Sequence, residues 1–362
     1  MKDRLQLGVG LGGLVVAMIA TMLLPAAPSQ TGTDCQERLA NPAPLTPAQR
    51  TFLETCVGAF ALPTGAPSPS APATTAPPAT ATPVPTTNPP STQPPSPAPE
   101  SEFPTPATTG VPAGWVPAST RTTDLKITEP AAVVQDIRLV NADLIIAAPS
   151  VTVRRVQIEG GAIHTKPGGT CFSVDLDQVS IIRTAGPTTG SEPAIEPGGY
   201  TARRVEINGL PEGFRVGAKA TCGTTTVLDS FALVRAPDVC GDWHGDGLQG
   251  YDGGALVVRH STLVLEERSG CGGTAPFFYP RNQGNTGPVT VDQLLVKGGG
   301  YTFRLGMWGH VTGLRIVAGS SYGPIDVRCS VVNPWEAQVV TVDTSYRIQS
   351  RVARSCNTES GA

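Results

Sequence analysis

A repeated eight-residue phrase constrains the fold of this chain more than any single residue does. The phrase reads apolar-x-apolar-charged-x-apolar-x-apolar, with the alternation of a strand on either side of a bend. Its seven copies begin 22 to 33 residues apart, by subtraction of starting positions, which is typical of a solenoid whose coils stack on a shared core. The copies are VTVRRVQI (from Val151), VDLDQVSI (Val174), YTARRVEI (Tyr200), TVLDSFAL (Thr226), LVVRHSTL (Leu256), VTVDQLLV (Val289) and VTGLRIVA (Val311).

The fourth place of the phrase tests this alignment independently, because the apolar residues alone define the repeat. Charges at that place alternate in sign from copy to copy. Equivalent residues of stacked coils lie about 4.8 Å apart, so like charges would repel and alternating charges form a ladder. We therefore interpret these residues as structural, setting the register, and not as catalytic. They are Arg154, Asp177, Arg203, Asp229, Arg259, Asp292 and Leu314.

A second recurring element lies between the phrases, a tetrad with a large apolar residue in second place. Strand alternation sends the second residue inward and the third outward. One tetrad and one bent phrase per coil predict an all-β fold, a right-handed parallel β-helix, because crossovers between parallel strands are almost always right-handed. The expected inward residues are Ile163, Ile195, Phe214, Leu248, Phe278, Phe303 and Ile325. The expected outward residues are His164, Glu196, Arg215, Gln249, Tyr279, Arg304 and Asp326.

Composition separates this β-helix from a long N-terminal region. The 36 prolines are concentrated before residue 119, and residues 61–118 form a Pro/Thr/Ser/Ala tract with almost no bulky apolar side chains. Such a tract cannot bury a core, which predicts a disordered, extended linker followed by a β-helix domain over 119–357. The net charge of -3 and the lack of a basic run give no electrostatic footprint for nucleic acid.

The first residues predict export. Two basic residues precede an uncharged stretch from Leu7 to Leu24, so residues 1–28 form a signal peptide or a membrane anchor. Pro28 directly follows the best small-residue cleavage site, which favours an uncleaved anchor. We therefore expect a secreted or cell-surface, membrane-anchored protein.

Eight cysteines in an exported chain predict four disulfides. The coil alignment places one pair in the same turn of adjacent coils and a second pair at equivalent places two coils apart. A third pair would tie down the last coils, and a fourth would close a small segment over 29–60 with a short helix near Thr46. Zinc is disfavoured because no CxxC or Cys/His cluster is present. In this order, the pairs are Cys240–Cys271, Cys171–Cys222, Cys329–Cys356 and Cys35–Cys56.

The turn over residues 240–254, CGDWHGDGLQGYDGG, has the highest density of polar residues. One interpretation is structural, with Asp242 and Asp246 capping turn amides. A second is a calcium site, since D-x-H-x-D-G is similar to the start of an EF-hand loop. The sequence departs from that loop at its third place, His244, and at its twelfth, Gly253.

The third interpretation is an acid–base site. His244 and Asp246 would transfer protons near Arg215 and Tyr279. The sequence leaves all three interpretations open. The outward row beside this turn suits an extended polymer with repeated carboxylate or hydroxyl groups.

The coil pattern over about residues 125–356 resembles the right-handed parallel β-helix, or pectin-lyase-like, superfamily. Many members cleave acidic polysaccharides as lyases or glycoside hydrolases, and others are phage tailspikes or surface adhesins. The resemblance implies glycan contact in an exposed groove. Polygalacturonase-like members carry Gly-His-Gly and Arg-x-Lys, which Gly309-His310-Val311 and Arg315-Ile316-Val317 match only in part. Pectate-lyase motifs are not recognisable, so no specific enzyme family is indicated.

Together these observations predict an exported β-helix that binds an acidic polysaccharide or cell-surface glycan and is a candidate polysaccharide lyase or glycoside hydrolase. In a lyase, arginines would neutralise uronate carboxylates while His244 or Tyr279 moves the α-proton and Asp246 orients the histidine. Inverting hydrolysis with Asp246 and a second carboxylate is less favoured. The alternative is a non-catalytic surface or phage-associated attachment protein. The catalytic candidates are His244, Asp246, Tyr279 and Arg215, and the substrate-binding candidates are Gln249, Arg304, Glu196, Trp243 and Asp242.

Overall fold

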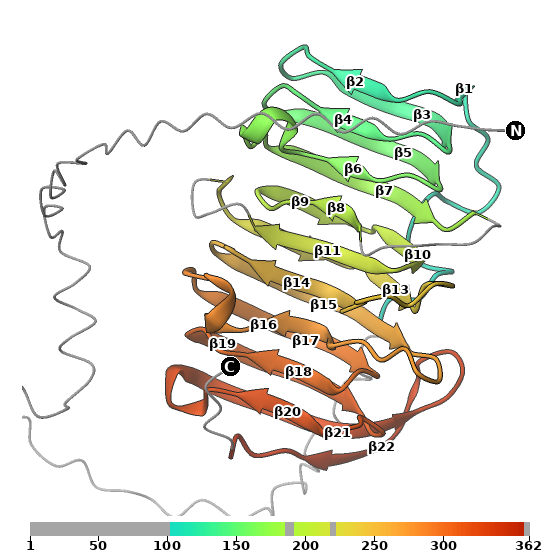
Figure 1. The fold of residues 1–362 in the computed structure, drawn as a ribbon. Coiled ribbons are helices and arrows are strands. Elements are labelled where there is room, and N and C mark those ends of the chain that lie inside the picture. The colour runs from blue at the N-terminus through green and yellow to red at the C-terminus, as the bar shows by residue number, and fades with distance from the viewer. Residues whose placement is uncertain (1–101, 185–191, 218–221, 358–362) are drawn as a thin grey trace, which may run out of the picture. The chain divides into compact units, whose positions relative to one another are not determined.

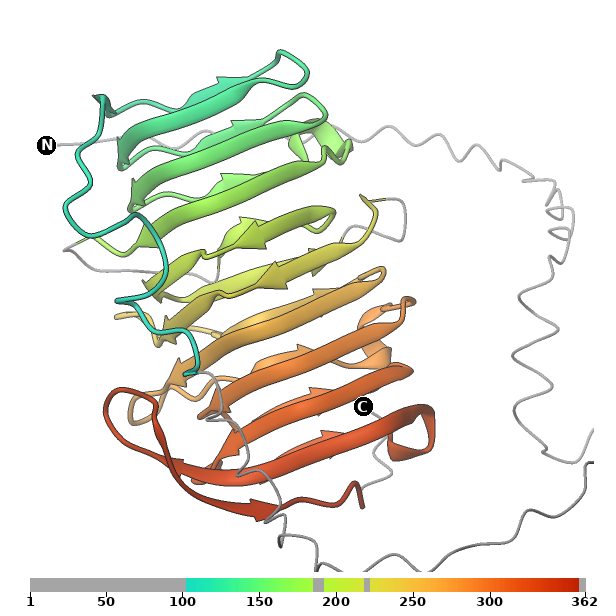
Figure 2. The same cartoon turned by 180° about the vertical axis from the view of Figure 1, so that it is seen from behind.

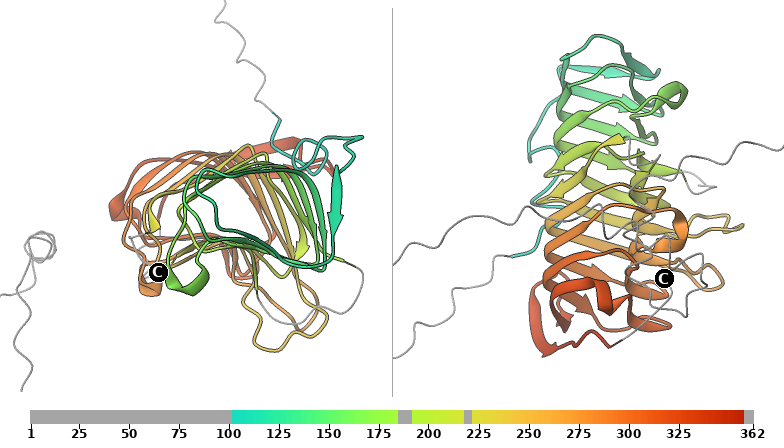
Figure 3. Two further views of the ribbon diagram at one scale, coloured as in Figure 1. Left: turned by 90° about the horizontal axis from the view of Figure 1, so that it is seen from above. Right: turned by 90° about the vertical axis from the view of Figure 1, so that its left-hand side faces the viewer.

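The chain folds as stacked coils of parallel β-strands (Figure 1). The computed structural model describes residues 102–184, 192–217 and 222–357, and this part of the chain contains no α-helix. The chain passes back and forth between a 13-stranded and a 9-stranded sheet, and three pairs of consecutive strands lie together in the larger sheet. Every pairing of strands is parallel except that of the last two. Viewed along the stack, the coils superimpose around a common interior (Figure 3). The described architecture is therefore that of a β-helix-like solenoid.

The strands of the two sheets have the following bounds. The 13-stranded sheet contains β1 (Ser119–Arg121), β3 (Val133–Val140), β5 (Val151–Glu159), β7 (Val174–Ile182), β9 (Tyr200–Arg203), β10 (Glu206–Leu210), β12 (Thr225–Leu228), β13 (Phe231–Arg235), β15 (Leu256–Glu266), β17 (Val289–Lys297), β19 (Gly309–Val317), β21 (Val332–Val342) and β22 (Ile348–Ala353). The 9-stranded sheet contains β2 (Leu125–Ile127), β4 (Leu144–Ile146), β6 (Ile163–His164), β8 (Pro193–Glu196), β11 (Glu212–Gly217), β14 (Asp246–Tyr251), β16 (Ala275–Tyr279), β18 (Tyr301–Leu305) and β20 (Gly323–Val327). Short 3-10 helices cover Pro167–Gly169, Arg281–Gln283 and Cys329–Val331.

The predicted phrases lie in the 13-stranded sheet, and five of the seven residues predicted for the fourth place are confirmed there. Asp177 lies between Arg154 and Arg203, and Arg259 pairs with Asp292. The other two residues were predicted wrongly, which removes three of the six expected contacts between successive residues of the ladder. Leu228, and not Asp229, pairs with both neighbouring arginines, and Thr312, and not Leu314, pairs with Asp292.

The bend inside each phrase explains these two errors. One residue per coil has a positive φ there, including Arg204 (51°), Asp229 (47°), His260 (41°) and Gly313 (61°). This residue marks the end of the first half of the phrase, even where the pattern of apolar residues suggests another position. Asp229 occupies the bend and not the fourth place, and Gly313 shifts the last copy by two residues. The register therefore follows the backbone bend, which the apolar alternation locates only approximately.

The charge ladder leads to a stability prediction. Replacing Asp177 with arginine should lower the free energy of unfolding by about 1 kcal/mol, because three arginines would follow one another and the ion pair with Arg204 (2.6 Å) would be lost. Urea denaturation measures this change. Asp175→Arg is the matched control, since its neighbours are Thr152 and Thr201. Equal losses in the two variants would show that the ladder does not set the register.

The predicted tetrads form strands of the 9-stranded sheet, with one correction. Leu248 pairs with Phe277, which pairs with Phe303, so Phe277 is the inward residue and Phe278 the outward one. Tyr279 was expected to face outward, but it is buried beside the core and its hydroxyl donates to the Gly254 carbonyl (2.5 Å). The run Phe-Phe-Tyr contains three large residues, each of which could fill the interior. Alternation alone therefore could not show which of them face inward.

The expected linker ends earlier than predicted. Residues 102–118 cross several coils of the 13-stranded sheet, as the teal segment in Figure 2 shows. Phe103 is buried against Leu295, Val317 and Val340. Farther along, the Trp115 indole donates to an Asp136 carboxylate oxygen (3.0 Å). This strap, residues 102–118, belongs to the β-helix unit.

Three predicted disulfides are confirmed: Cys171–Cys222, Cys240–Cys271 and Cys329–Cys356. They indicate an extracellular or otherwise oxidising environment. The predicted Cys35–Cys56 bridge, the segments over 1–28 and 29–60, and most of the linker lie outside the described residues. Within the described ranges, no helix is long and apolar enough to cross a membrane.

Candidate functional site

A row of mostly polar and charged side chains, interrupted by Phe278, follows the outward face of the 9-stranded sheet. Its members lie at equivalent places of successive strands from β6 to β20, and we call them the outward row. Because neighbouring strands lie about 4.8 Å apart, the row presents a functional group at each such interval. Its members are His164, Glu196, Arg215, Gln249, Phe278, Arg304 and Asp326.

At one end of the row, His164 lies between two carboxylates. Its Nε2 is 3.2 Å from Asp143 Oδ2, and its Nδ1 is 3.0 Å from Glu196 Oε2. These two partners raise the pKa of His164 to about 10, and the histidine in turn lowers the pKa of both carboxyl groups. The imidazole is therefore protonated at neutral pH and serves as a fixed cation.

A buried pair of carboxyl groups lies beside the middle of the row. Glu212 and Asp246 occupy the same place in the neighbouring strands β11 and β14, because Phe214 pairs with Leu248. Their exposed fractions are 1% and 0%. Glu212 Oε1 is 2.6 Å from Arg215 Nη2, and Asp246 Oδ2 accepts a hydrogen bond from the Gln249 amide (3.0 Å). Each acid is thus joined to the outward-row residue three positions later.

Burial gives this acid pair unusual proton affinity. Removal from water raises the pKa of Glu212 to about 7, and outweighs the opposing effect of the Arg215 guanidinium. The same desolvation raises the pKa of Asp246 well above its usual value, and the negative charge of Glu212 adds to that rise. The pair therefore takes up protons at a much higher pH than exposed carboxylates do.

The far end of the row combines an ion pair with aromatic rings. Arg304 Nε is 2.6 Å from Asp326 Oδ2. The same guanidinium lies over the Phe278 ring, 5.3 Å from its centroid, and 6.0 Å from the centroid of Tyr301. Cation–π contact and the ion pair together fix the orientation of Arg304.

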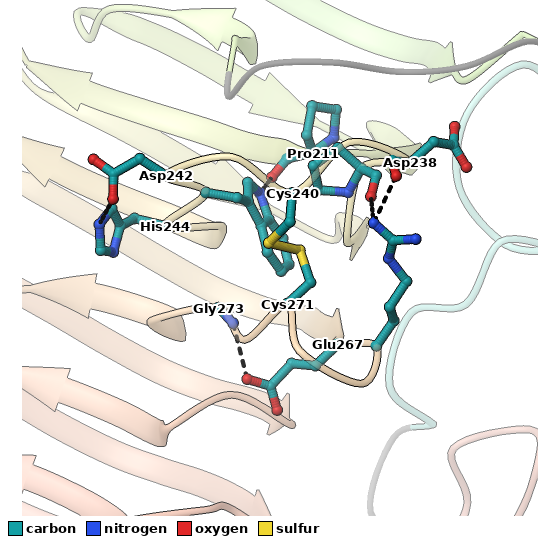
Figure 4. Close-up of a disulfide and its surroundings, with 11 residues drawn as sticks. Pro211, Asp238, Cys240, Asp242, His244, Glu267, Cys271 and Gly273 are labelled. Carbon is teal, nitrogen blue, oxygen red and sulfur yellow. Dashed lines mark hydrogen bonds and ion pairs between the residues drawn. A yellow bond between two sulfur atoms is a disulfide. The ribbon is translucent and has the colours of Figure 1, made fainter.

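A buried tryptophan and a disulfide hold the turn before β14, and Figure 4 shows the disulfide. Trp243 is 4% exposed, and its indole nitrogen donates to the Pro211 carbonyl (2.8 Å). The Cys240–Cys271 disulfide joins this turn to the next loop. Trp243 was a substrate-binding candidate, but the structure places it beneath the turn, where it holds the backbone that leads into Asp246.

The structure brings only part of the predicted catalytic group together. Asp246 lies near Gln249 and Arg215. His244 is exposed and instead pairs with Asp242 (3.1 Å), and Tyr279 bonds to Gly254 on the inner side. Within the described residues, no group of three or more His, Cys, Asp or Glu side chains is arranged to hold a metal ion.

Sequence reasoning missed Glu212. A signal for it exists, because Glu-Gly-Phe-Arg at 212–215 and Asp-Gly-Leu-Gln at 246–249 repeat one order, acid-glycine-apolar-polar, in adjacent coils. The glycine is required in the first copy, since a Cβ on Gly213 would lie 2.0 Å from the Gly247 carbonyl oxygen. The repeated motif therefore marks a closely stacked corner at which both acids meet the outward row.

Comparison with known proteins found no family model, no curated protein and no solved structure that matches this chain. The functional argument therefore depends on the geometry of the outward row and the acid pair.

Proposed function

We propose that this protein is an exported, right-handed parallel β-helix that binds an extended glycan along the outward row. The observation that carries the proposal is the regular spacing of polar groups across successive strands, with Phe278 as the one apolar member. Sugar hydroxyls both donate and accept hydrogen bonds, so a surface that holds donors and acceptors in fixed positions can bind them. The ion pairs of His164, Arg215 and Arg304 provide that fixed orientation.

The ion pairing also bears on the class of glycan. Arg215 and Arg304 each have a carboxylate partner at 2.6 Å, so a uronate group would have to compete with Glu212 or Asp326. A hydroxyl-rich, uncharged polymer needs no such exchange. We therefore favour a neutral polysaccharide over the acidic one expected from the sequence.

Glycosidic cleavage is a second candidate function, favoured by the pKa of about 7 at Glu212 beside Asp246. Neither acid is open to solvent, which is why binding is the leading proposal. Incubation with neutral and uronate polymers distinguishes the outcomes. New reducing ends without unsaturated sugars indicate a hydrolase, new reducing ends together with unsaturated sugars indicate a lyase, and binding without products indicates an attachment protein.

The export part of the proposal depends on the sequence. Residues 1–28 would direct export and hold the protein at the cell surface, with the Pro-rich tract as a spacer. Fractionation of cells that express the full chain tests this, and a cytosolic protein with reduced cysteines would contradict it.

Replacing Gln249 with alanine should weaken glycan binding about tenfold, because a half-buried amide at the centre of the row would lose its hydrogen bonds. Isothermal titration calorimetry with soluble neutral polymers measures the affinity, and circular dichroism confirms the fold. Gln349→Ala is the matched control, since Gln349 is exposed on β22 of the other sheet. An unchanged affinity in Gln249→Ala would place the glycan elsewhere.

A further inference from the structure

A polar groove lies on the outward face of the other, 13-stranded sheet. It has a volume of about 550 Å³ and crosses β5, β7, β10 and β13. Small-molecule sites typically have volumes of about 300–1,000 Å³. Two columns of outward side chains form its floor, Gln157–Ser180–Glu206 and Ile182–Asn208. The groove is therefore large enough for a ligand the size of one or two sugar units.

The strap forms one wall of this groove. The backbone amide of Val111 donates to Ser180 Oγ (3.0 Å), which fixes the strap over the column of polar residues. A Cβ on Gly110 would lie 2.1 Å from Ser180 Oγ and 2.7 Å from Glu206 Oε2, so only glycine permits this approach. The wall is thus a fixed part of the structure.

Glu206 is the acidic side chain that faces the groove. Its carboxylate accepts hydrogen bonds from Ser180 Oγ (3.0 Å) and Asn208 Nδ2 (3.1 Å), both of which are neutral donors. The arginines at the rim have carboxylate partners of their own. Arg235 pairs with Glu266 (2.7 Å), and Arg183 pairs with Asp238. Glu206 is therefore oriented by neighbours that do not neutralise a carboxylate charge.

We propose that this groove binds an amino-sugar unit through Glu206. The ammonium group of the sugar would form a charge-assisted hydrogen bond with the carboxylate, and its hydroxyls would bond to Gln157 and Asn208. The apolar face of the sugar ring would pack on Ile182 and Val111. This site lies on a different sheet from the outward row, so the inference does not depend on the proposed function.

Calorimetric titration with soluble glucosamine oligomers and with their N-acetylated counterparts tests the proposal. The wild-type protein should bind the glucosamine oligomers more tightly, and added salt should weaken that binding. Glu206→Gln should lower the affinity for glucosamine oligomers about tenfold. The matched control Glu336→Gln, an exposed position on β21, should leave it unchanged.

Three results would overturn the proposal. The first is that wild-type protein does not bind glucosamine oligomers. The second is equal affinity in wild type and Glu206→Gln, with the fold of both confirmed by circular dichroism. The third is that Gln249→Ala, and not Glu206→Gln, removes binding, because the oligomer would then occupy the outward row.

Discussion

Replacing Trp243 with alanine is expected to lower the free energy of unfolding by about 3–5 kcal/mol, the cost of removing a buried aromatic side chain. The indole packs against Val234, Leu265 and Cys271 in a small cluster under the turn. It also donates a hydrogen bond to the Pro211 carbonyl, which would be left without that donor. Urea denaturation followed by circular dichroism measures the loss.

The same change should weaken the proposed glycan binding. A Cβ on Gly245 would lie 2.0 Å from the Trp243 ring, so the ring sets the path of the chain immediately before Asp246. Without the ring, Asp246 would lose its fixed position, and so would Gln249, the residue of the outward row that donates a hydrogen bond to it. Affinity should therefore fall even under conditions in which the variant stays folded.

Trp308→Ala is the matched control for Trp243→Ala. Trp308 is 53% exposed, so its removal should cost less than about 1 kcal/mol and leave glycan affinity unchanged. Similar destabilisation in both variants would mean that Trp243 has no special anchoring role. If Trp243→Ala lowers the stability but leaves the glycan affinity unchanged, the turn does not contribute to glycan binding.

The repeated phrase allowed most of the fold to be predicted because two independent patterns agreed. Apolar alternation defined the strands, and the charges of Arg154, Asp177 and Arg203 defined their register. The alignment of the tetrads predicted the Cys240–Cys271 pair, since equivalent turns of adjacent coils meet. One error occurred where neighbouring residues are all large and apolar or aromatic, as at Tyr279, so that alternation is not visible. Another occurred where one residue of positive φ moved the bend, as at Asp229.

The candidate site was less predictable because its properties arise from contacts between coils. The alignment gave the outward row at all but one of its places, and it led to Arg215 and Gln249. It could not show that Glu212 and Asp246 are buried together, because their burial depends on how the turns fold over them. Nor could it show that His244, two residues from Asp246, pairs with Asp242.

Glu212 should make the protein less stable at about pH 8 than at about pH 5. Its pKa in the folded protein is about 7, above the ordinary value of 4.5, so folding favours the protonated form. The resulting stability is present below pH 4.5 and is lost as the pH rises through about 7. The loss is about 2–3 kcal/mol. The raised pKa of Asp246 also lowers the stability as the pH rises. The raised pKa of His164 adds a further loss of stability that begins above pH 6.5.

Glu212→Gln isolates this contribution, because glutamine keeps the shape of the side chain and does not titrate. Urea denaturation measures the free energy of unfolding at about pH 5 and at about pH 8. Between these two pH values, the decrease should be about 2–3 kcal/mol smaller in the variant than in the wild type. Glu336→Gln, at an exposed position, should follow the wild-type profile. Opposing carboxylates such as Asp136, whose pKa is about 2, lose their stabilising effect only at lower pH and do not disturb this range. Parallel profiles for Glu212→Gln and wild type would mean that the acid at 212 is already ionised at about pH 5, and would remove the basis for acid catalysis at this site.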